Sequence, residues 1–186
     1  MEQCVDVIAE LVTDHAEATA LLDVIAATPA GDPARKRLTD ELTVELVRHS
    51  VAERNFLHPA LRLHLPDGAD IAHEETAEHL RLLGVLKELE GMEAGAPGFD
   101  PLIHRLRREV SAHTGRVETA IFPMLRATCA AQVLENLGAR VRRAKHYAPT
   151  RAHPGVPNTP PAGVLLVSGT GLVDRTLGVL SGPGGS

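Results

Sequence analysis

Residues 49–59 read His-Ser-Val-Ala-Glu-Arg-Asn-Phe-Leu-His-Pro, and residues 113–123 read His-Thr-Gly-Arg-Val-Glu-Thr-Ala-Ile-Phe-Pro. Each stretch begins with a histidine, carries a glutamate four or five residues later and ends in a proline ten residues after the histidine. Both lie in longer regions where apolar residues recur with the roughly 3.6-residue period of an amphipathic helix. A proline inside such a region bends a helix. We therefore expect one helix to kink near Pro59 and another to continue past Pro123.

The same period, followed outward from these stretches, predicts four long helices and one shorter helix. They cover about residues 5–27, 33–59, 71–90, 101–125 and 130–146. Asp32 and Asp100 are expected to cap the second and fourth helices, because each precedes a proline at the first helical position. Long helices joined by short loops run antiparallel. The predicted fold class is therefore all-α, an antiparallel up-down four-helix bundle with an additional short C-terminal helix and an extended Pro/Gly-rich tail.

The composition changes at residue 148, where Pro, Gly, Ser and Thr replace the helical pattern. This change divides the chain into a bundle domain, residues 1–147, and a tail, residues 148–186. Within the tail, Val164–Val167 and Leu172–Leu180 are apolar enough to pack on the bundle. The sequence leaves two states of the tail open, partly disordered or docked on the bundle. The tail is also a candidate binding segment for a protein partner.

The composition argues against several functional classes. The 186 residues carry a formal net charge of −5, so we expect no broad positive surface to hold nucleic acid. No window approaches the roughly 18 apolar residues that a membrane span requires, and the first residues lack the pattern of a secretion signal. The two cysteines form no metal-thiolate motif. We therefore expect a cytoplasmic protein that binds neither nucleic acid nor a membrane.

Ten residues are histidines, and four of them fall one to each long predicted helix. In antiparallel helices these four can share one layer, because they lie at similar distances from the turns. Carboxylates accompany three of them at a spacing of four or five residues, which is close to one helical turn. The four histidines are His15, His49, His79 and His113, and the three carboxylates are Glu53, Glu75 and Glu118.

A metal site would account for this pattern. Polar side chains on the buried faces of four helices cost several kcal/mol unless they are paired or bind a metal. Imidazole and carboxylate ligands without thiolate favour iron, manganese or zinc over calcium, and seven ligands suit two metal ions. The alternative is that these groups are hydrogen-bonded core or surface side chains. A spacing of five from His113 places Glu118 at the edge of the helix face, unless the turn between them is widened.

The series His15, His49-Ser-Val-Ala-Glu53, Glu75-Thr-Ala-Glu-His79 and His113-Thr-Gly-Arg-Val-Glu118 resembles the hemerythrin family and its HHE cation-binding domain, over about residues 5–145. The region after residue 148 is similar to the tails of actinobacterial members. The resemblance implies a non-haem di-iron centre that meets O₂, NO or hydrogen peroxide, and some members are catalase-like. The two iron ions would be held by His15, His49, Glu53, Glu75, His79, His113 and Glu118. Glu53 and Glu118 would then be the bridging carboxylates.

Three positions depart from the family pattern. Val117 and Arg54 occupy places where relatives often carry an acid. His58 stands where the actinobacterial branch usually has a tyrosine, itself a candidate iron ligand, so His58 is an additional candidate metal ligand. We expect solvent-exposed positions for the five remaining histidines, which are His64, His73, His104, His146 and His153.

The resemblance implies two functions of different classes. The first is a redox protein that binds or decomposes O₂, NO or hydrogen peroxide at two irons, with catalase-like turnover as its enzymatic form. The second is an iron-sensing or iron-binding module with a regulatory or interaction role and no turnover. In a third interpretation, the altered positions leave a bundle that no longer holds two metals.

Overall fold

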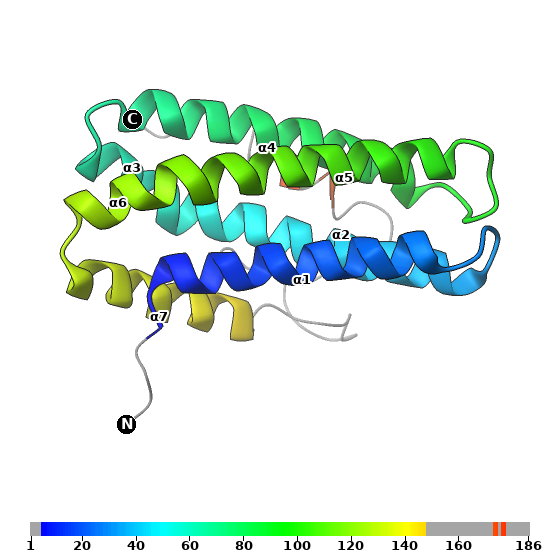
Figure 1. Ribbon diagram of the computed structural model, residues 1–186, viewed down its shortest axis with the longest axis horizontal. Helices are drawn as coiled ribbons and strands as arrows, with labels where there is room; N and C mark the ends of the chain where they lie inside the picture. Colours follow the sequence, from blue (N-terminus) through cyan, green and yellow to red (C-terminus); the bar gives the residue numbers. More distant parts are fainter. Residues whose placement is uncertain (1–4, 148–172, 175, 178–186) are drawn as a thin grey trace.

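The computed structural model describes residues 5–147, 173, 174, 176 and 177. Four long helices lie side by side along the longest axis of the molecule (Figure 1). They are α1 (Val7–Ala27), α2 (Pro33–Ala52), α4 (Gly68–Glu90) and α5 (Phe99–Arg116). Each packs against the next along the chain, and α1 also packs against α5, which closes the bundle. The predicted all-α antiparallel bundle with a further C-terminal helix is confirmed.

The two expected helix caps have different outcomes. Asp32 caps α2 as predicted, because its carboxylate accepts from the Ala34 amide at 2.8 Å. Asp100 does not cap α5, because the helix already begins at Phe99. The Asp100 carboxylate instead accepts from the buried guanidinium of Arg35 at 2.6 Å. Asp100 therefore pairs with a buried cation of a neighbouring helix and does not cap its own helix. Sequence spacing alone does not reveal this pairing.

Helices α2 and α5 each widen into a π-helical turn before their prolines. These turns are η1 (Glu53–Leu57), followed by α3 (His58–His64), and η2 (Val117–Ile121), followed by α6 (Phe122–Thr128). Proline lacks an N–H donor and its ring clashes with the carbonyl four residues earlier, which favours a wider turn just before it. The His58 amide accordingly donates to the Glu53 carbonyl, five residues back, and the Phe122 amide donates to the Val117 carbonyl. The irregularity expected near Pro59 is thus a π turn.

The two widened helices match each other position by position. The π turns begin at residues 53 and 117, an offset of 64 residues, and α3 and α6 begin at residues 58 and 122 with the same offset. The same offset relates His15 to His79 and His49 to His113. The bundle therefore consists of a first half, α1 to α3, and a second half, α4 to α6, with equivalent residues 64 positions apart.

The additional helix, α7 (Ala131–Tyr147), packs along the outside of α1 (Figure 1). Arg142 donates to the Val5 carbonyl at 2.7 Å and to the Glu10 carboxylate at 2.8 Å. Gly138 allows the close approach of the two segments, because a Cβ at this position would lie 2.4 Å from the Val5 carbonyl oxygen. The basic residues late in this helix therefore serve at least partly to hold it on the bundle.

Two apolar clusters fill the bundle. The first cluster lies toward the loops 28–32 and 91–98 and includes Leu22, Leu86 and Phe99. The second cluster lies toward the π turns and α7 and includes Leu57 and Ile121. The histidines of the four long helices lie between these two clusters, so apolar packing covers the polar layer from both ends.

Part of the tail docks on the bundle. Val173 is buried in the first apolar cluster, and Leu177 packs against the same cluster. Asp174 forms an ion pair with Lys87 on α4. The sequence leaves docking open for Leu172–Leu180. The described residues of that segment are docked on the bundle. The other apolar segment of the tail, Val164–Val167, lies outside the described residues.

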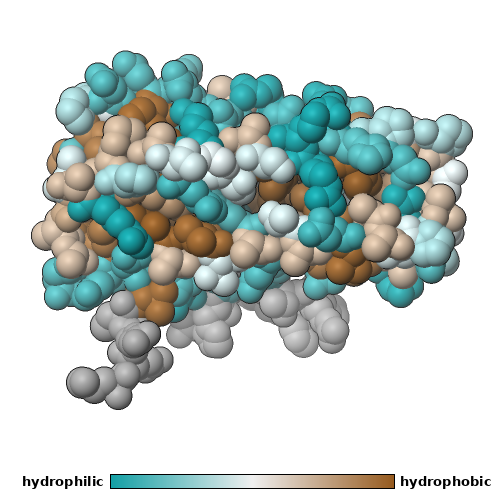
Figure 2. Space-filling view, viewed as in Figure 1, coloured by the Kyte–Doolittle hydropathy of each residue, from teal (hydrophilic) through white to brown (hydrophobic). Residues whose placement is uncertain are grey.

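The face shown in Figure 2 carries hydrophilic residues interspersed with smaller hydrophobic areas. Large apolar side chains that are exposed include Val12 and Val24 on α1, Leu63 on α3 and Met124 on α6. Within the part of the chain that the structure describes, no helix is both long enough and apolar enough to cross a membrane.

Candidate metal centre

Four histidine side chains meet in the middle of the bundle, and each has 5% or less of its surface exposed. The ring centroids of His15 and His49 lie 4.8 Å apart, and those of His79 and His113 lie 4.9 Å apart. The two pairs approach each other to 5.6 Å, measured between the rings of His15 and His113. The structure thus brings together the four histidines whose spacing predicted a single layer.

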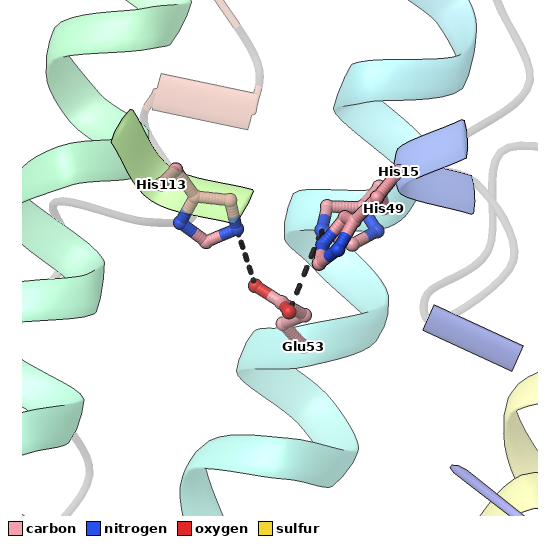
Figure 3. Close-up of side chains that lie close together, drawn as sticks. All are labelled: His15, His49, Glu53 and His113. Carbon is pink, nitrogen blue, oxygen red and sulfur yellow. Dashed lines mark hydrogen bonds and ion pairs between the residues drawn. The ribbon is translucent and has the colours of Figure 1, made fainter. Parts of the chain in front are cut away.

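Glu53 lies at the centre of this histidine layer (Figure 3). The side chain is fully buried. Its Oε1 atom lies 3.4 Å from Nε2 of His49, and its Oε2 atom lies 3.0 Å from Nε2 of His79 and 3.5 Å from Nε2 of His113. One carboxylate therefore faces imidazoles from both halves of the molecule, which is the placement required of a bridging ligand.

Two groups of four buried side chains have the geometry of metal sites. In each group, one nitrogen or oxygen atom from every residue lies within 4.8 Å of those of the other three. The first group is His15, His49, Glu53 and His113, and the second group is Glu53, Glu75, His79 and His113. Because the groups share two residues, two ions bound in them would be neighbours.

Several atoms that face these groups lack hydrogen-bond partners among the described residues. Both oxygens of Glu53 and the Nε2 atoms of His79 and His113 are buried in this state. An unpaired buried polar group costs about 1–3 kcal/mol, and coordination to a cation would remove that cost. The donor set of imidazole nitrogens and carboxylate oxygens suits iron, manganese or zinc. The residues present therefore fit a pair of such ions.

Carboxylates lie beside the Nδ1 atoms of three of the imidazoles. Glu118 lies 2.7 Å from Nδ1 of His15, and Asp14 lies 3.3 Å from Nδ1 of His49. Nδ1 of His113 lies 3.3 Å from the buried Glu75 and 3.5 Å from Glu78. These contacts leave the Nε2 atoms of His15, His49 and His113 on the inner side, and carboxylate–histidine pairs of this kind fix the ring of a metal ligand. Sequence reasoning missed the roles of Asp14 and Glu78. The available signal was that each directly precedes a layer histidine.

Glu118 and His58 are the two predicted site residues that join neither group of four. The side chain of Glu118 is 38% exposed, and its contact is with the outer nitrogen of His15. His58 is buried and its ring lies parallel to that of His79, with centroids 5.9 Å apart. Its Nδ1 atom lies 3.5 Å from the Thr76 hydroxyl, and its Nε2 atom has no hydrogen-bond partner among the described residues. The widened turn considered for Glu118 is present as η2.

Arg116 holds the carboxylates of α4 on the outer side of the second group. Its guanidinium forms ion pairs with Glu74 at 3.0 Å, with Glu78 at 3.2 Å and with the fully buried Glu75. Burial raises the pKa of Glu75 to about 7, against the opposing charges of His113 and Arg116. Arg116 is the third residue near the site that sequence reasoning missed, since nothing in its spacing distinguishes it from a surface arginine.

The pKa values of His15 and His49, both in the first group, shift in opposite directions. Burial, followed by the charge of His49, lowers the pKa of His15 to about 4. Burial also opposes the charged form of His49, but Glu53 and Asp14 outweigh it and raise the pKa of His49 to about 9. The pKa of Glu53 lies well below its usual range, because the charges of His49 and His113 outweigh the cost of burial. The directions of these shifts favour a charged His49 facing an ionised Glu53.

Three of the remaining histidines, His64, His73 and His104, belong to neither group. His73 and His104 are exposed and His64 is half-buried, so exposure is as expected for two of the five and partial for the third. The side chain of His146 and all of His153 lie outside the described residues.

Comparisons with known proteins concern the sequence and the fold of the chain. The sequence pattern of the hemerythrin HHE cation-binding domain matches residues 6–145. An uncharacterized hemerythrin-like protein of Schizosaccharomyces pombe is 27% identical over 126 residues, which are 67% of this chain and 62% of the yeast protein. The chain thus spans about three fifths of that relative's length. The crystal structure of a hemerythrin HHE cation-binding domain-containing protein from Mycobacterium kansasii superimposes with a TM-score of 0.66, 24% identity, and coverage of 77% of this chain and 90% of the other. This second similarity supports the fold.

Proposed function

This chain belongs to the hemerythrin HHE cation-binding domain family, and we propose that it is a non-haem di-iron protein that binds or reacts with O₂, NO or hydrogen peroxide. The observation that carries the proposal is the shared carboxylate. Glu53 faces His49 through one oxygen and His79 and His113 through the other, and it belongs to both groups of candidate ligands. A single bridging carboxylate between two sets of imidazoles is an arrangement for two adjacent metal ions.

We propose six ligands from the two groups of four, which are His15, His49, Glu53, Glu75, His79 and His113. Glu118, a predicted bridging ligand, would need to leave the outer nitrogen of His15 to coordinate, and His58 would need to leave its position beside His79. Two adjacent iron ions, when bound, supply electron transfer to a small oxygen- or nitrogen-containing molecule. The chain's own contribution is to orient the imidazoles through Asp14, Glu78 and Glu118 and to exclude bulk water with the two apolar clusters.

Metal analysis tests the proposal. Protein produced in iron-replete cells and analysed by plasma mass spectrometry should contain close to two irons per chain. A content of zero or one would contradict the di-iron proposal. If two irons are present, rapid oxygen release after addition of hydrogen peroxide, measured with an oxygen electrode against the metal-free protein, would support catalase-like turnover.

The second candidate function is an iron-sensing or iron-binding module that acts through a protein partner and has no turnover. The docked tail segment favours it, because Val173 and Leu177 pack on the cluster that contains Ala18 and Leu46, one turn from the histidine layer. A partner that removed this segment would alter packing beside the metal centre. Val173→Asp, which disfavours docking, should then change the rate of iron release to a chelator. An unchanged rate together with oxygen release from peroxide would favour the redox protein.

A further inference from the structure

A small cavity lies against the histidine layer. Its volume is about 20 Å³, which is room for about one water molecule. All four histidines of the layer, His15, His49, His79 and His113, line it. A molecule inside the cavity would therefore lie beside both groups of candidate metal ligands.

The apolar wall of the cavity contains one residue from each long helix. These residues are Ala18, Leu46, Leu82 and Val110, each three positions from the histidine of its own helix. Side chains at this spacing share a helix face, so the four form a layer directly over the histidines. Three of the four are branched, and the fourth is alanine. Ala18 and Leu82 are equivalent under the 64-residue offset, so the wall lacks bulk on the α1 side.

The cavity also reaches solvent beside α1. Among the residues that line it, Glu17 is exposed, and Asp14, Glu45 and Thr114 are half-buried. Asp14 and Glu17 lie on α1, one turn or less from Ala18. The outer rim of the cavity is therefore polar, whereas the wall over the histidines is apolar.

The equivalent region of the second half carries a bulkier apolar residue, Leu82, and a network of charged side chains. Arg81 stands where the first half has Glu17, and its guanidinium lies 3.9 Å from the carboxylates of both Glu78 and Glu109. Arg116 adds ion pairs to Glu78 and to the buried Glu75. The second half thus has a leucine and this charge network at the positions where the first half has Ala18 and Glu17.

We propose that Ala18 is the size-limiting residue of an entrance beside α1, through which small uncharged molecules of the size of NO, O₂ or hydrogen peroxide reach the metal centre. This inference rests on the proposed function. The alanine leaves the space, the four histidines lie at its inner end, and the apolar wall disfavours charged molecules because they would lose their hydration there.

The test is the rate at which nitric oxide binds to the reduced, iron-loaded protein, measured by stopped-flow absorbance. Ala18→Leu adds three carbon atoms to a cavity that holds about one water, so the association rate should fall at least tenfold while the iron content stays unchanged. Ala18→Val, a smaller addition, should give an intermediate rate and covers the case in which Ala18→Leu does not fold. Iron content is measured for every variant, as a readout separate from reactivity.

Ala60→Leu is the matched control. Ala60 is a buried alanine on α3 in the second apolar cluster, and its equivalent under the 64-residue offset is Met124, a longer side chain. Its nitric oxide rate should equal that of the wild type. Rates within twofold of the wild type for both Ala18 variants, with full iron content, would overturn the entrance. Failure of the iron-loaded wild type to bind nitric oxide would instead overturn the proposed reaction with such molecules, and the entrance with it.

Discussion

The first half of the molecule (α1 to α3) and the second half (α4 to α6) place equivalent residues, 64 positions apart, around one centre. Each half contributes two histidines, a π turn before a proline, and an acid that contacts the outer nitrogen of its second histidine. The repeated part is therefore the scaffold, which consists of the four imidazoles and the acids Asp14 and Glu78.

The halves differ in where they supply the inner carboxylates. Glu53 of the first half corresponds to Val117 of the second, and Glu75 of the second corresponds to Leu11 of the first. The first group of candidate ligands accordingly has three imidazoles and one carboxylate, whereas the second has two of each. Two ions bound here would therefore have different sets of ligands. Both groups also depend on one shared carboxylate, Glu53.

The shared carboxylate predicts the largest effect. Glu53→Gln keeps the size of the side chain but removes the charge that faces three imidazoles, so we expect loss of both irons, measured by plasma mass spectrometry. The control is Val117→Ala, at the equivalent position of the second half. It removes apolar packing only and should leave two irons per chain. Retention of iron in Glu53→Gln would show that the two groups do not depend on this residue.

His113 should have the next largest effect. It belongs to both groups of candidate ligands, so His113→Ala should lose at least one iron per chain. His104 lies on the same helix but is exposed, and His104→Ala should retain the wild-type iron content. Equal iron content in the two variants would refute the assignment of His113.

The sequence predicts the scaffold better than the site. Helical periodicity locates the long helices, and Pro59 predicts an irregularity where η1 is observed. The sequence leaves a widened turn beside Glu118 as an open alternative, and η2 is that turn. The shared layer follows from one histidine per helix. The outer contacts are not predictable in this way, because the contacts of Asp14 with His49 and of Arg116 with Glu75 depend on how side chains of two neighbouring helices meet. The direction of the Glu118 side chain also depends on its exposure at the edge of the π turn.

Substitution of Asp14 or Glu78 should weaken metal affinity moderately. The two residues are equivalent, so their variants compare the two halves of the molecule directly. Asp14→Asn and Glu78→Gln each remove the negative charge beside an outer imidazole nitrogen, and loss of such a partner typically weakens metal affinity about 10- to 100-fold. Competition with a chelator would measure both. Glu78→Gln should weaken the binding of both ions, because His113 belongs to both groups, whereas Asp14→Asn should weaken the first group alone. Wild-type affinity in both variants would show that the outer contacts do not support metal binding.

The smallest effect on iron content is expected for a change at His58. Its equivalent in the second half is Phe122. His58 stacks on His79 with an interplanar angle of 3°, and its equivalent, Phe122, stacks on His15 with an angle of 7°. The matching geometry indicates that this position packs against a ligand ring in both halves. His58→Phe, which makes the halves alike, should therefore keep two irons per chain. It also removes a buried nitrogen without a described hydrogen-bond partner, so the metal-free protein should gain about 1 kcal/mol in unfolding free energy, measured by urea denaturation. Loss of one iron would instead make His58 a metal ligand and break the equivalence with Phe122.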